Sequence, residues 1–450
     1  MKNFRIFVMM LAIVAVSCQQ ETAVEDNSEP VNSENENAVS KEEALEALYS
    51  ELDFLYGEST RSNRGAVKDI KTVQFDDMVC STRSLDVEID DVLYIVEFED
   101  GKGSAILGAD KRVEDVFAVL DDGVISVEDF ENAANGVEID ELNTYLAGLI
   151  TEEVIEQIST ASNFVPAPGI DNGLRYGYFE YQTLVEEEEE CYLLTKWDQR
   201  SPYNELCYNE AGQKCVAGCV TIAAAQAILY SYPHPYDIIL VDSLTNEATT
   251  FDKRLLNLKC DDIVLSAEEQ EEVDAEVARY VFKLAQLLDI NLQTGSSGGS
   301  TSNIAGVLSA TGVYNDVNFV YLDSNDFLGS VRDQLYIRKL PAPFRGGQTN
   351  GGAGHSWVLD AYKYLKKNVY LCTVEGGQLV RREYWGVEET RKVHCNFGWS
   401  GMCDGYYTFG MFDVSNALDD SDIVGEIGDV AGEVGYYPFN ANPGIIVYSL

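Results

Sequence analysis

A thiol and three imidazoles are the side chains of this sequence best suited to act as nucleophile and base. Cys219 opens the apolar run CVTIAAAQAILYSYPH, and the three histidines are His234, His355 and His394. The small and apolar residues of the run favour a helix that Pro233 ends, which places Cys219 in the first helical turn. Free N–H groups and the helix dipole at that position stabilise a thiolate and a developing oxyanion. The pattern indicates nucleophilic chemistry at Cys219.

Two other roles for Cys219 are open at this point. A helix that is apolar on all sides belongs in the centre of a large domain, where a cysteine packs as a small hydrophobe. Cys219 could also form a disulfide with Cys215. A partner base would decide between these roles and catalysis.

Two glycine-rich segments carry the candidate partners of the thiol. RGGQTNGGAGHSWVLDAYKY puts His355 at the start of a strand, beside flexible backbone that lets a substrate approach. KVHCNFGWSGMCDGYYTF contains Asn396, whose side chain could hold the second imidazole nitrogen. His234 is excluded as the base, because a straight helix would separate it from Cys219 by about 20 Å. His394 shares a strand face with Asn396 and stays a competitor.

The cysteine count bears on redox state and on metals. With Cys18 set aside, nine cysteines remain, and an odd number leaves at least one thiol unpaired. A disulfide between Cys395 and Cys403 is a secondary prediction. Because the sequence has no CxxC pair and no Cys/His cluster with zinc spacing, we expect neither a structural metal nor a cofactor.

Composition restricts the class of protein. The chain has 450 residues, 46% of them hydrophobic, which indicates a packed globular protein of two or three domains. Seventy-six acidic against 31 basic residues give a formal net charge of −45. This charge repels nucleic acid and anionic membrane surfaces, so we expect no nucleic-acid partner.

The N-terminus is typical of an export signal. In MKNFRIFVMMLAIVAVSCQQ, two basic residues precede an apolar run that is too short to span a bilayer. Ala-Val-Ser-Cys at 15–18 resembles a bacterial lipobox, although Ala15 stands where Leu is commoner, and it predicts lipidation of Cys18. The alternative is a signal cleaved nearby with an incidental Cys18. We expect an exported protein, lipid-anchored to a bacterial membrane at the outer membrane or cell surface.

The rest of the chain divides by composition. Helical spacing over 41–56, with Ser40 as N-cap, is followed by short apolar runs between Asp-Gly turns and by a second helix near 137–160. The run VEEEEE before Cys191 reads as a solvated loop. We predict a signal peptide at 1–18, an acidic tether at 19–40, an α+β domain at 41–165, a linker with the activation region at 166–190, and a catalytic domain at 191–450.

Six ordered blocks resemble the streptopain family of papain-like cysteine peptidases. They are WDQRSPYNELC (197–207), VAGCVTIAAAQAILYSYPHP (216–235), GSSGGSTSNIAGVL (295–308), GHSWVLDAY (354–362), NFGWSGMCDGYY (396–407) and the closing YYPFNANPGIIVYSL. The resemblance implies an α+β fold, in which a papain-like domain with a central helix packed on an antiparallel sheet follows a small α+β propeptide domain. It also implies that Cys219 is the nucleophile, His355 the general base and later the acid, Asn396 the residue that orients the imidazole, and Gln199 the side-chain donor of the oxyanion hole.

The same blocks suggest the substrate-binding and regulatory parts. We assign substrate binding to Trp399, Gly298, Ser300 and Gly354. The segment VLYIVEFEDGKGSAILGADKRVEDVFAVLDDG resembles the inhibitory propeptide of the family. Three positions depart from the family pattern: Phe397 replaces a Trp, Ser400 replaces a glycine, and Ala361 follows Asp360 where glycine is usual. The last two would narrow the cleft.

The resulting hypothesis is a secreted, lipid-anchored cysteine endopeptidase made as a zymogen. Its partners would be protein or peptide substrates and its own propeptide as inhibitor, with the membrane reached solely through the lipid. Two alternatives stay open. One is a catalytically silent surface binding lipoprotein with a peptidase fold, and the other is a papain-like amidase or transferase that uses the same dyad.

Overall fold

A long antiparallel sheet runs through the computed structural model. The structure describes residues 37–57, 66–79, 91–135, 142–160, 175–260, 263–321, 327–347, 354–375, 378–412 and 441–450. The strand order is β1-β2-β3-β4-β12-β11-β10-β9-β13-β8, and β5 also pairs with β10. Cys18, Cys80 and most of the predicted tether lie outside the described residues.

The strands of this sheet are β1 (Val67–Gln74), β2 (Asp91–Phe98), β3 (Ser104–Gly108), β4 (Val116–Leu120), β5 (Arg175–Glu189), β8 (Asn315–Tyr321), β9 (Ala342–Gly347), β10 (His355–Glu375), β11 (Gln378–Asn396), β12 (Gly405–Thr408) and β13 (Ala441–Ser449). A separate hairpin pairs β6 (Asp237–Val241) with β7 (Ala248–Asp252). The helices are α1 (Lys41–Tyr56), α2 (Phe75–Met78), α3 (Val127–Ala134), α4 (Leu142–Thr160), α5 (Cys219–Ser231), α6 (Lys253–Asn257), α7 (Ala267–Leu287), α8 (Asn303–Thr311) and α9 (Phe327–Arg332).

The elements predicted for the N-terminal region are present. Helix α1 begins with the expected capping box, in which the Glu43 N–H donates to Ser40 Oγ at 3.2 Å and the Ser40 N–H donates to the Glu43 carboxylate at 2.9 Å. The apolar runs form β2, β3 and β4, which pair in sequence. The second helix is observed as α4, preceded by the shorter α3.

The N-terminal region shares its sheet and its core with the rest of the chain. Strand β4 pairs with β12, and Val119 lies opposite Tyr406. One hydrophobic cluster contains Phe117 and Leu146 from this region together with Trp357 from β10. The interior is therefore continuous from β1 to β11.

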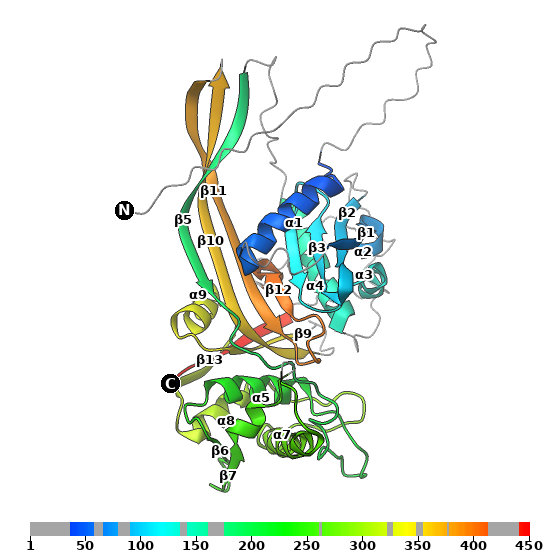
Figure 1. Cartoon of the computed structure of the whole chain (residues 1–450), viewed down its shortest axis with the longest axis vertical. Helices are drawn as coiled ribbons and strands as arrows, with labels where there is room; N and C mark the ends of the chain where they lie inside the picture. The colour runs from blue at the N-terminus through cyan, green and yellow to red at the C-terminus, as the bar shows by residue number, and fades with distance from the viewer. Residues whose placement is uncertain are drawn as a thin grey trace, which may run out of the picture. The chain divides into compact units, whose positions relative to one another are not determined.

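The acidic run before Cys191 is a strand, which corrects the expectation of a solvated loop. Residues 175–189 form β5 and pair along their length with β10 (Figure 1). Basic side chains neutralise the run: Arg332 donates to Glu187 at 2.6 Å, Lys339 to Glu189 at 2.8 Å, and Lys363 to Glu188. Because these lysines and the arginine come from distant segments, the acidic run by itself could not indicate that its charge is neutralised.

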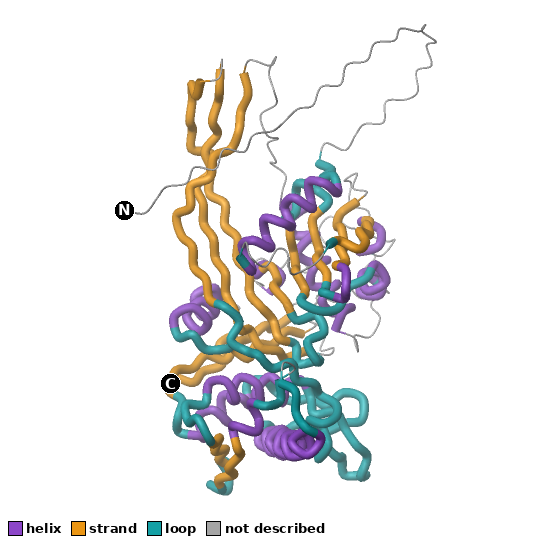
Figure 2. Tube along the Cα trace, in the orientation of Figure 1, coloured by secondary structure: helices purple, strands orange, loops and turns teal. Residues whose placement is uncertain are grey.

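Helix α5 is the buried helix that the sequence predicted. Its residues from Val220 to Leu229 are all buried, and it packs against β10, α7 and α8. The chain between β5 and α5 has no regular element and is drawn as loop in Figure 2. The longest helix beside it, α7, is amphipathic and buries one face that includes Val273, Val277 and Val281.

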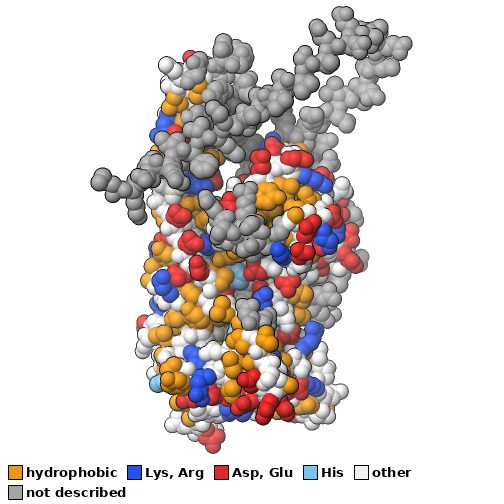
Figure 3. Space-filling model, viewed as in Figure 1, with side chains coloured by type: hydrophobic (Ala, Val, Ile, Leu, Met, Phe, Trp, Pro, Cys, Tyr) orange, Lys and Arg blue, Asp and Glu red, His pale blue; other side chains and the backbone are white. Residues whose placement is uncertain are grey.

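The surface reflects the acidic composition. Figure 3 shows red acidic side chains spread over the visible face, with fewer blue basic ones between them. Within the part of the chain that the structure covers, no helix is both long and apolar enough to traverse a bilayer.

Candidate active site

Cys219 is the first residue of α5, as its spacing predicted. The N-cap is Gly218, whose φ of 91° is in the region that favours glycine. A Cβ on Gly218 would lie 3.0 Å from the carbonyl oxygen of Ser297, so a larger residue would crowd the loop that covers the helix start. This turn fixes the position of the thiol.

The sulfur of Cys219 meets the start of strand β10. It lies close to the backbone N–H groups of Ser356, Val220 and Cys219 itself, whose hydrogen-bonding influence favours the thiolate. Burial nevertheless raises the pKa of the thiol above its usual value, because desolvation outweighs this influence. The lowered pKa expected from the helix dipole is therefore wrong for this form of the chain. Cys219 has no disulfide, and Cys215 is also free.

His355 immediately precedes Ser356, so it lies next in sequence to the residue whose backbone is beside the thiol. Its Nε2 lies 3.2 Å from the carbonyl oxygen of Phe397, which can only accept, so Nε2 carries the proton and Nδ1 is the free acceptor. The rings of Trp357, Phe397 and Trp399 lie about the imidazole, with centroids 6.0, 6.1 and 6.2 Å away. Burial lowers the pKa of His355 to about 4.

Asn396 is buried near this ring but does not hydrogen-bond to it here. Its Nδ2 donates to the Thr195 carbonyl at 2.8 Å, and its Oδ1 accepts from Gln226 Nε2 at 2.9 Å and from the Gly398 N–H at 3.3 Å. The bond to the imidazole comes instead from the next residue's backbone. A direct orienting role for Asn396 stays a prediction.

Phe397 is held in place from its other side. Its N–H donates to the carboxylate of Asp404 at 2.8 Å, and burial raises the pKa of Asp404 to about 7. The neighbouring Gly398 has φ 70°, and a Cβ there would meet Ile222 of α5 at 2.8 Å. The turn after β11 therefore lies directly against the helix that carries the thiol.

Gln199 also lies beside the helix start. Its carbonyl accepts the Ala217 N–H at 2.8 Å, two residues before Cys219. The segment is tied to the tryptophan loop, because the Trp197 carbonyl accepts the Ser400 N–H at 3.1 Å and the Arg200 guanidinium lies 5.6 Å from the Trp399 ring. The structure thus brings Cys219, His355, Gln199 and Trp399 into one neighbourhood.

A comparison with protein families agrees with this arrangement. Residues 197–407 match the Peptidase C10 family. The chain is therefore a cysteine-type peptidase, and the resemblance to the streptopain family is confirmed.

Two solved structures from Prevotella intermedia are similar to the peptidase. A mutant fragment of prointerpain A is 16% identical, with 84% of this chain and 98% of that chain covered and a TM-score of 0.47. Active wild-type interpain A cysteine protease is 19% identical, with 58% of this chain and 94% of that chain covered and a TM-score of 0.38. No match is found among curated proteins.

The predicted substrate-binding glycine and serine residues of the peptidase lie on the loop beside the site. Gly298 forms a two-way backbone pair with Asn291, with N···O distances of 2.9 and 3.3 Å. Ser300 is exposed and its hydroxyl lies 2.7 Å from that of Ser302. The Thr301 hydroxyl shares a hydrogen bond with the Ser356 hydroxyl, so this loop contacts β10 beside His355. Gly354 is exposed at the start of that strand.

The two competing histidines lie elsewhere. His234 is exposed beyond the end of α5, which agrees with its exclusion as the base. His394 is buried on β11, where Nδ1 lies 2.6 Å from Asp360 Oδ1 and Nε2 lies 3.1 Å from Asp121 Oδ2. Both of its nitrogens are thus engaged by carboxylates rather than by Cys219.

The predicted disulfide between Cys395 and Cys403 is wrong for this structure, in which both thiols are free. Cys395 is fully buried in the sheet. Cys403 has φ 61° in the turn before β12, and its sulfur donates to Asn143 Oδ1 of α4 at 3.0 Å. The turn therefore directs this thiol toward the N-terminal region.

The three departures from the family pattern have different surroundings. Phe397 keeps an apolar shield beside the imidazole. Ser400 has φ 56°, a conformation that glycine adopts more readily, and its hydroxyl donates to Asp198 at 2.9 Å. Ala361 is fully buried in the cluster under α1, so it does not narrow the cleft.

Sequence reasoning missed the supports of this site. Gln226 accepts from the Thr195 hydroxyl at 2.7 Å and donates to Asn396, which links α5 to both flanking segments. The sequence could have indicated Gln226, because it is the sole amide side chain in the largely apolar helix α5. The Phe397 carbonyl had no signal, since every residue carries one.

Proposed function

We propose that the chain is a lipid-anchored cysteine endopeptidase, exported and made as a zymogen, that cleaves peptide bonds through an acyl-enzyme on Cys219. The observation that carries this proposal is the packing of α5 against β10, which places the Ser356 backbone beside the Cys219 sulfur. It joins the head of α5 to the residue next to His355, although the two segments are far apart in the sequence.

The chemistry follows from these positions. His355 takes the thiol proton through its free Nδ1, and the thiolate attacks the scissile carbonyl. The Cys219 N–H and the Gln199 side chain stabilise the oxyanion. His355 then protonates the leaving amine and activates water, which hydrolyses the thioester and restores the thiol. The Phe397 carbonyl accepts from Nε2–H throughout, and so stabilises the imidazolium.

The surroundings of Cys219 and His355 support the proposal that the full-length chain is an inactive zymogen. Burial raises the pKa of Cys219 and lowers that of His355, so the neutral thiol and imidazole are favoured over the ion pair. Tyr145 of α4 packs edge-on against Trp357 at 6.3 Å and would collide with a Cβ on Gly346, the strand partner of His355. We infer that the region 41–165 acts as the inhibitory propeptide.

Export and anchoring rest on the N-terminal sequence. Ala-Val-Ser-Cys at 15–18 supports lipidation of Cys18 after signal cleavage. In a bacterial host, a palmitate analogue should label the wild type and not Cys18→Ala, and the variant should leave the membrane fraction. Equal labelling of both proteins would contradict the anchor and leave the peptidase proposal untouched.

The proposed reaction is tested with Cys219→Ala. We expect this variant to lose turnover of casein and self-processing, with Cys260→Ser as a matched control that retains both. An epoxide inhibitor of thiol peptidases should alkylate Cys219 stoichiometrically after proteolytic activation. Equal casein turnover by Cys219→Ala and the wild type would refute the mechanism, and turnover of small amides without peptides would indicate an amidase.

A further inference from the structure

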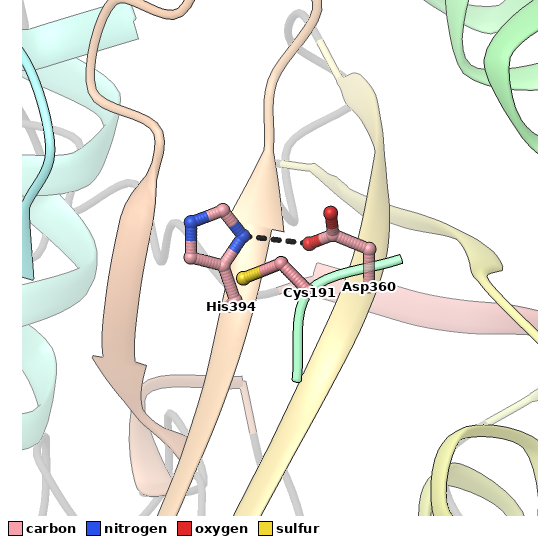
Figure 4. A group of neighbouring side chains, drawn as sticks. All are labelled: Cys191, Asp360 and His394. Carbon is pink, nitrogen blue, oxygen red and sulfur yellow. Dashed lines mark hydrogen bonds and ion pairs between the residues drawn. The ribbon is translucent and has the colours of Figure 1, made fainter. Parts of the chain in front are cut away.

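A second cluster of chemistry-bearing side chains lies where β10, the strand that begins with His355, meets β11 and the segment after β5. Cys191, Asp360 and His394 offer a sulfur, an oxygen and a nitrogen that all lie within 4.8 Å of one another (Figure 4). They come from the segment after β5, from β10 and from β11. The proposed peptidase mechanism uses none of them.

A β-bulge builds this cluster. Leu359 pairs with Cys395 and Ala361 pairs with His394, so Asp360 is the extra residue on β10. A bulge redirects the side chain of the extra residue, and the Asp360 carboxylate reaches His394 Nδ1 at 2.6 Å. Asp360 is fully buried, so this carboxylate is committed to the cluster.

The same bulge holds the cysteine. The Asp360 carbonyl accepts the Tyr192 N–H at 2.9 Å, and Asp360 Oδ2 accepts the Leu193 N–H at 3.2 Å. These bonds fix the segment that carries Cys191 against the strand. Cys191 keeps part of its surface exposed, which gives an ion a path to the buried oxygen and nitrogen.

His394 has the outer partner that metal-binding histidines require. When one ring nitrogen binds a metal, the other usually donates its proton to a carboxylate or carbonyl. His394 Nε2 lies 3.1 Å from Asp121 Oδ2, and the Tyr56 hydroxyl donates to Asp121 Oδ1 at 2.9 Å. Nδ1 is therefore the nitrogen directed at a shared ion.

We propose that Cys191, Asp360 and His394 bind Zn²⁺. A thiolate, an imidazole and a carboxylate are a donor set suited to zinc and not to Ca²⁺ or Mg²⁺, which prefer oxygen alone. Neighbouring donors of a tetrahedral zinc site lie about 3.3–3.8 Å apart, so shifts of about 1 Å bring the three atoms to the ion. The zinc replaces the proton between His394 Nδ1 and Asp360, and water completes its coordination.

The sequence could not indicate this site. Its three donors are 34 and 169 positions apart, whereas zinc motifs are recognised by ligands a few residues apart. The expectation of no metal rested on that spacing. The proposal is independent of catalysis, since all its ligands lie outside the Cys219 and His355 pair.

The test uses the full-length chain with Cys219→Ala, so that the catalytic thiol cannot bind the metal. We expect titration calorimetry with zinc sulfate to give one site per chain, and Co²⁺ in its place to give a thiolate-to-cobalt absorption band. Cys191→Ser should abolish the band, whereas the matched control Cys260→Ser should keep it. Asp121→Asn, which alters the outer partner alone, should weaken zinc binding by about 10–100-fold.

Two results would overturn the zinc proposal. Absence of stoichiometric zinc binding in the folded Cys219→Ala chain would overturn it. Binding that Cys191→Ser and His394→Gln both leave unchanged would overturn it as well. Because Cys191 is partly exposed, its serine variant should fold, and its circular dichroism spectrum checks this before the titration.

Discussion

The Nε2 atom of His355 lies 3.2 Å from the carbonyl oxygen of Phe397, and this bond assigns the ring proton to Nε2 and leaves Nδ1 as the basic nitrogen. A backbone acceptor cannot be removed by a side-chain substitution, so it orients the imidazole whichever residue occupies position 397. The surrounding aromatic rings cover part of the imidazole. Burial is consequently the dominant influence on the ionisation of both Cys219 and His355.

The first prediction concerns the pH dependence of stability. Burial lowers the pKa of His355 to about 4, whereas an unfolded histidine titrates near pH 6.5. Between these values the unfolded chain binds more protons, so the contribution of His355 to the free energy of unfolding falls as the pH falls, by up to about 3 kcal/mol. Relative to the wild type, His355→Gln should therefore gain stability as the pH is lowered from 7 to 4. Urea titrations of both proteins across this range test it, and parallel stability curves would contradict it.

The second prediction concerns the thiol of the full-length chain. Because burial raises the pKa of Cys219, we expect iodoacetamide at neutral pH to modify it at least about tenfold more slowly than the partly exposed Cys260. Peptide mapping by mass spectrometry compares both thiols in one sample. After proteolytic removal of the N-terminal region the order should reverse. Fast modification of Cys219 in the intact chain would argue against latency.

A third prediction addresses the buried amide that links α5 to its neighbours. Gln226→Leu leaves the Thr195 hydroxyl and the Trp197 N–H without the Gln226 oxygen that accepts from them. It also removes one of the two donors to Asn396 Oδ1. Each such loss costs about 1–3 kcal/mol, so we expect the free energy of unfolding to fall by about 2–5 kcal/mol. Gln286→Leu, on the exposed side of α7, is the matched control and should change stability by less than about 0.5 kcal/mol. A loss for Gln226→Leu no larger than that of the control would show that this network contributes little.

The fourth prediction locates the activating cleavage. A peptidase binds its substrate as extended, accessible backbone, and residues 175–189 are paired with β10 along the whole of β5. The segment after β5 is also bonded, through Tyr192 and Leu193, to Asp360. We expect the mature enzyme to begin before Arg175 and to retain β5. N-terminal sequencing of the active form measures this directly, and a mature N-terminus beyond Glu189 would be incompatible with it.

Local patterns predicted the helices and the position of the candidate nucleophile at a helix start well. The capping box of α1, the apolar α5 and the amphipathic α7 follow from residues that interact with near neighbours. Cys219 at a helix start and His355 at a strand start were likewise readable, because each depends on the few residues around it. The six ordered blocks then indicated the family that residues 197–407 match.

Contacts between residues far apart in the sequence determined the features of the fold and of the site that local patterns did not predict. The acidic strand β5 pairs with β10 and is neutralised by Arg332, Lys339 and Lys363 from distant segments. The bond to His355 comes from a backbone carbonyl. Neither the ion pairs of β5 nor the backbone bond to His355 can be predicted from neighbouring residues in the sequence. The bulge at Asp360, which gathers Cys191 and His394, likewise depends on the register between β10 and β11. The sequence by itself determined which residues can do chemistry, whereas the tertiary structure decided which of them meet, since strand register and charge neutralisation are properties of the folded chain.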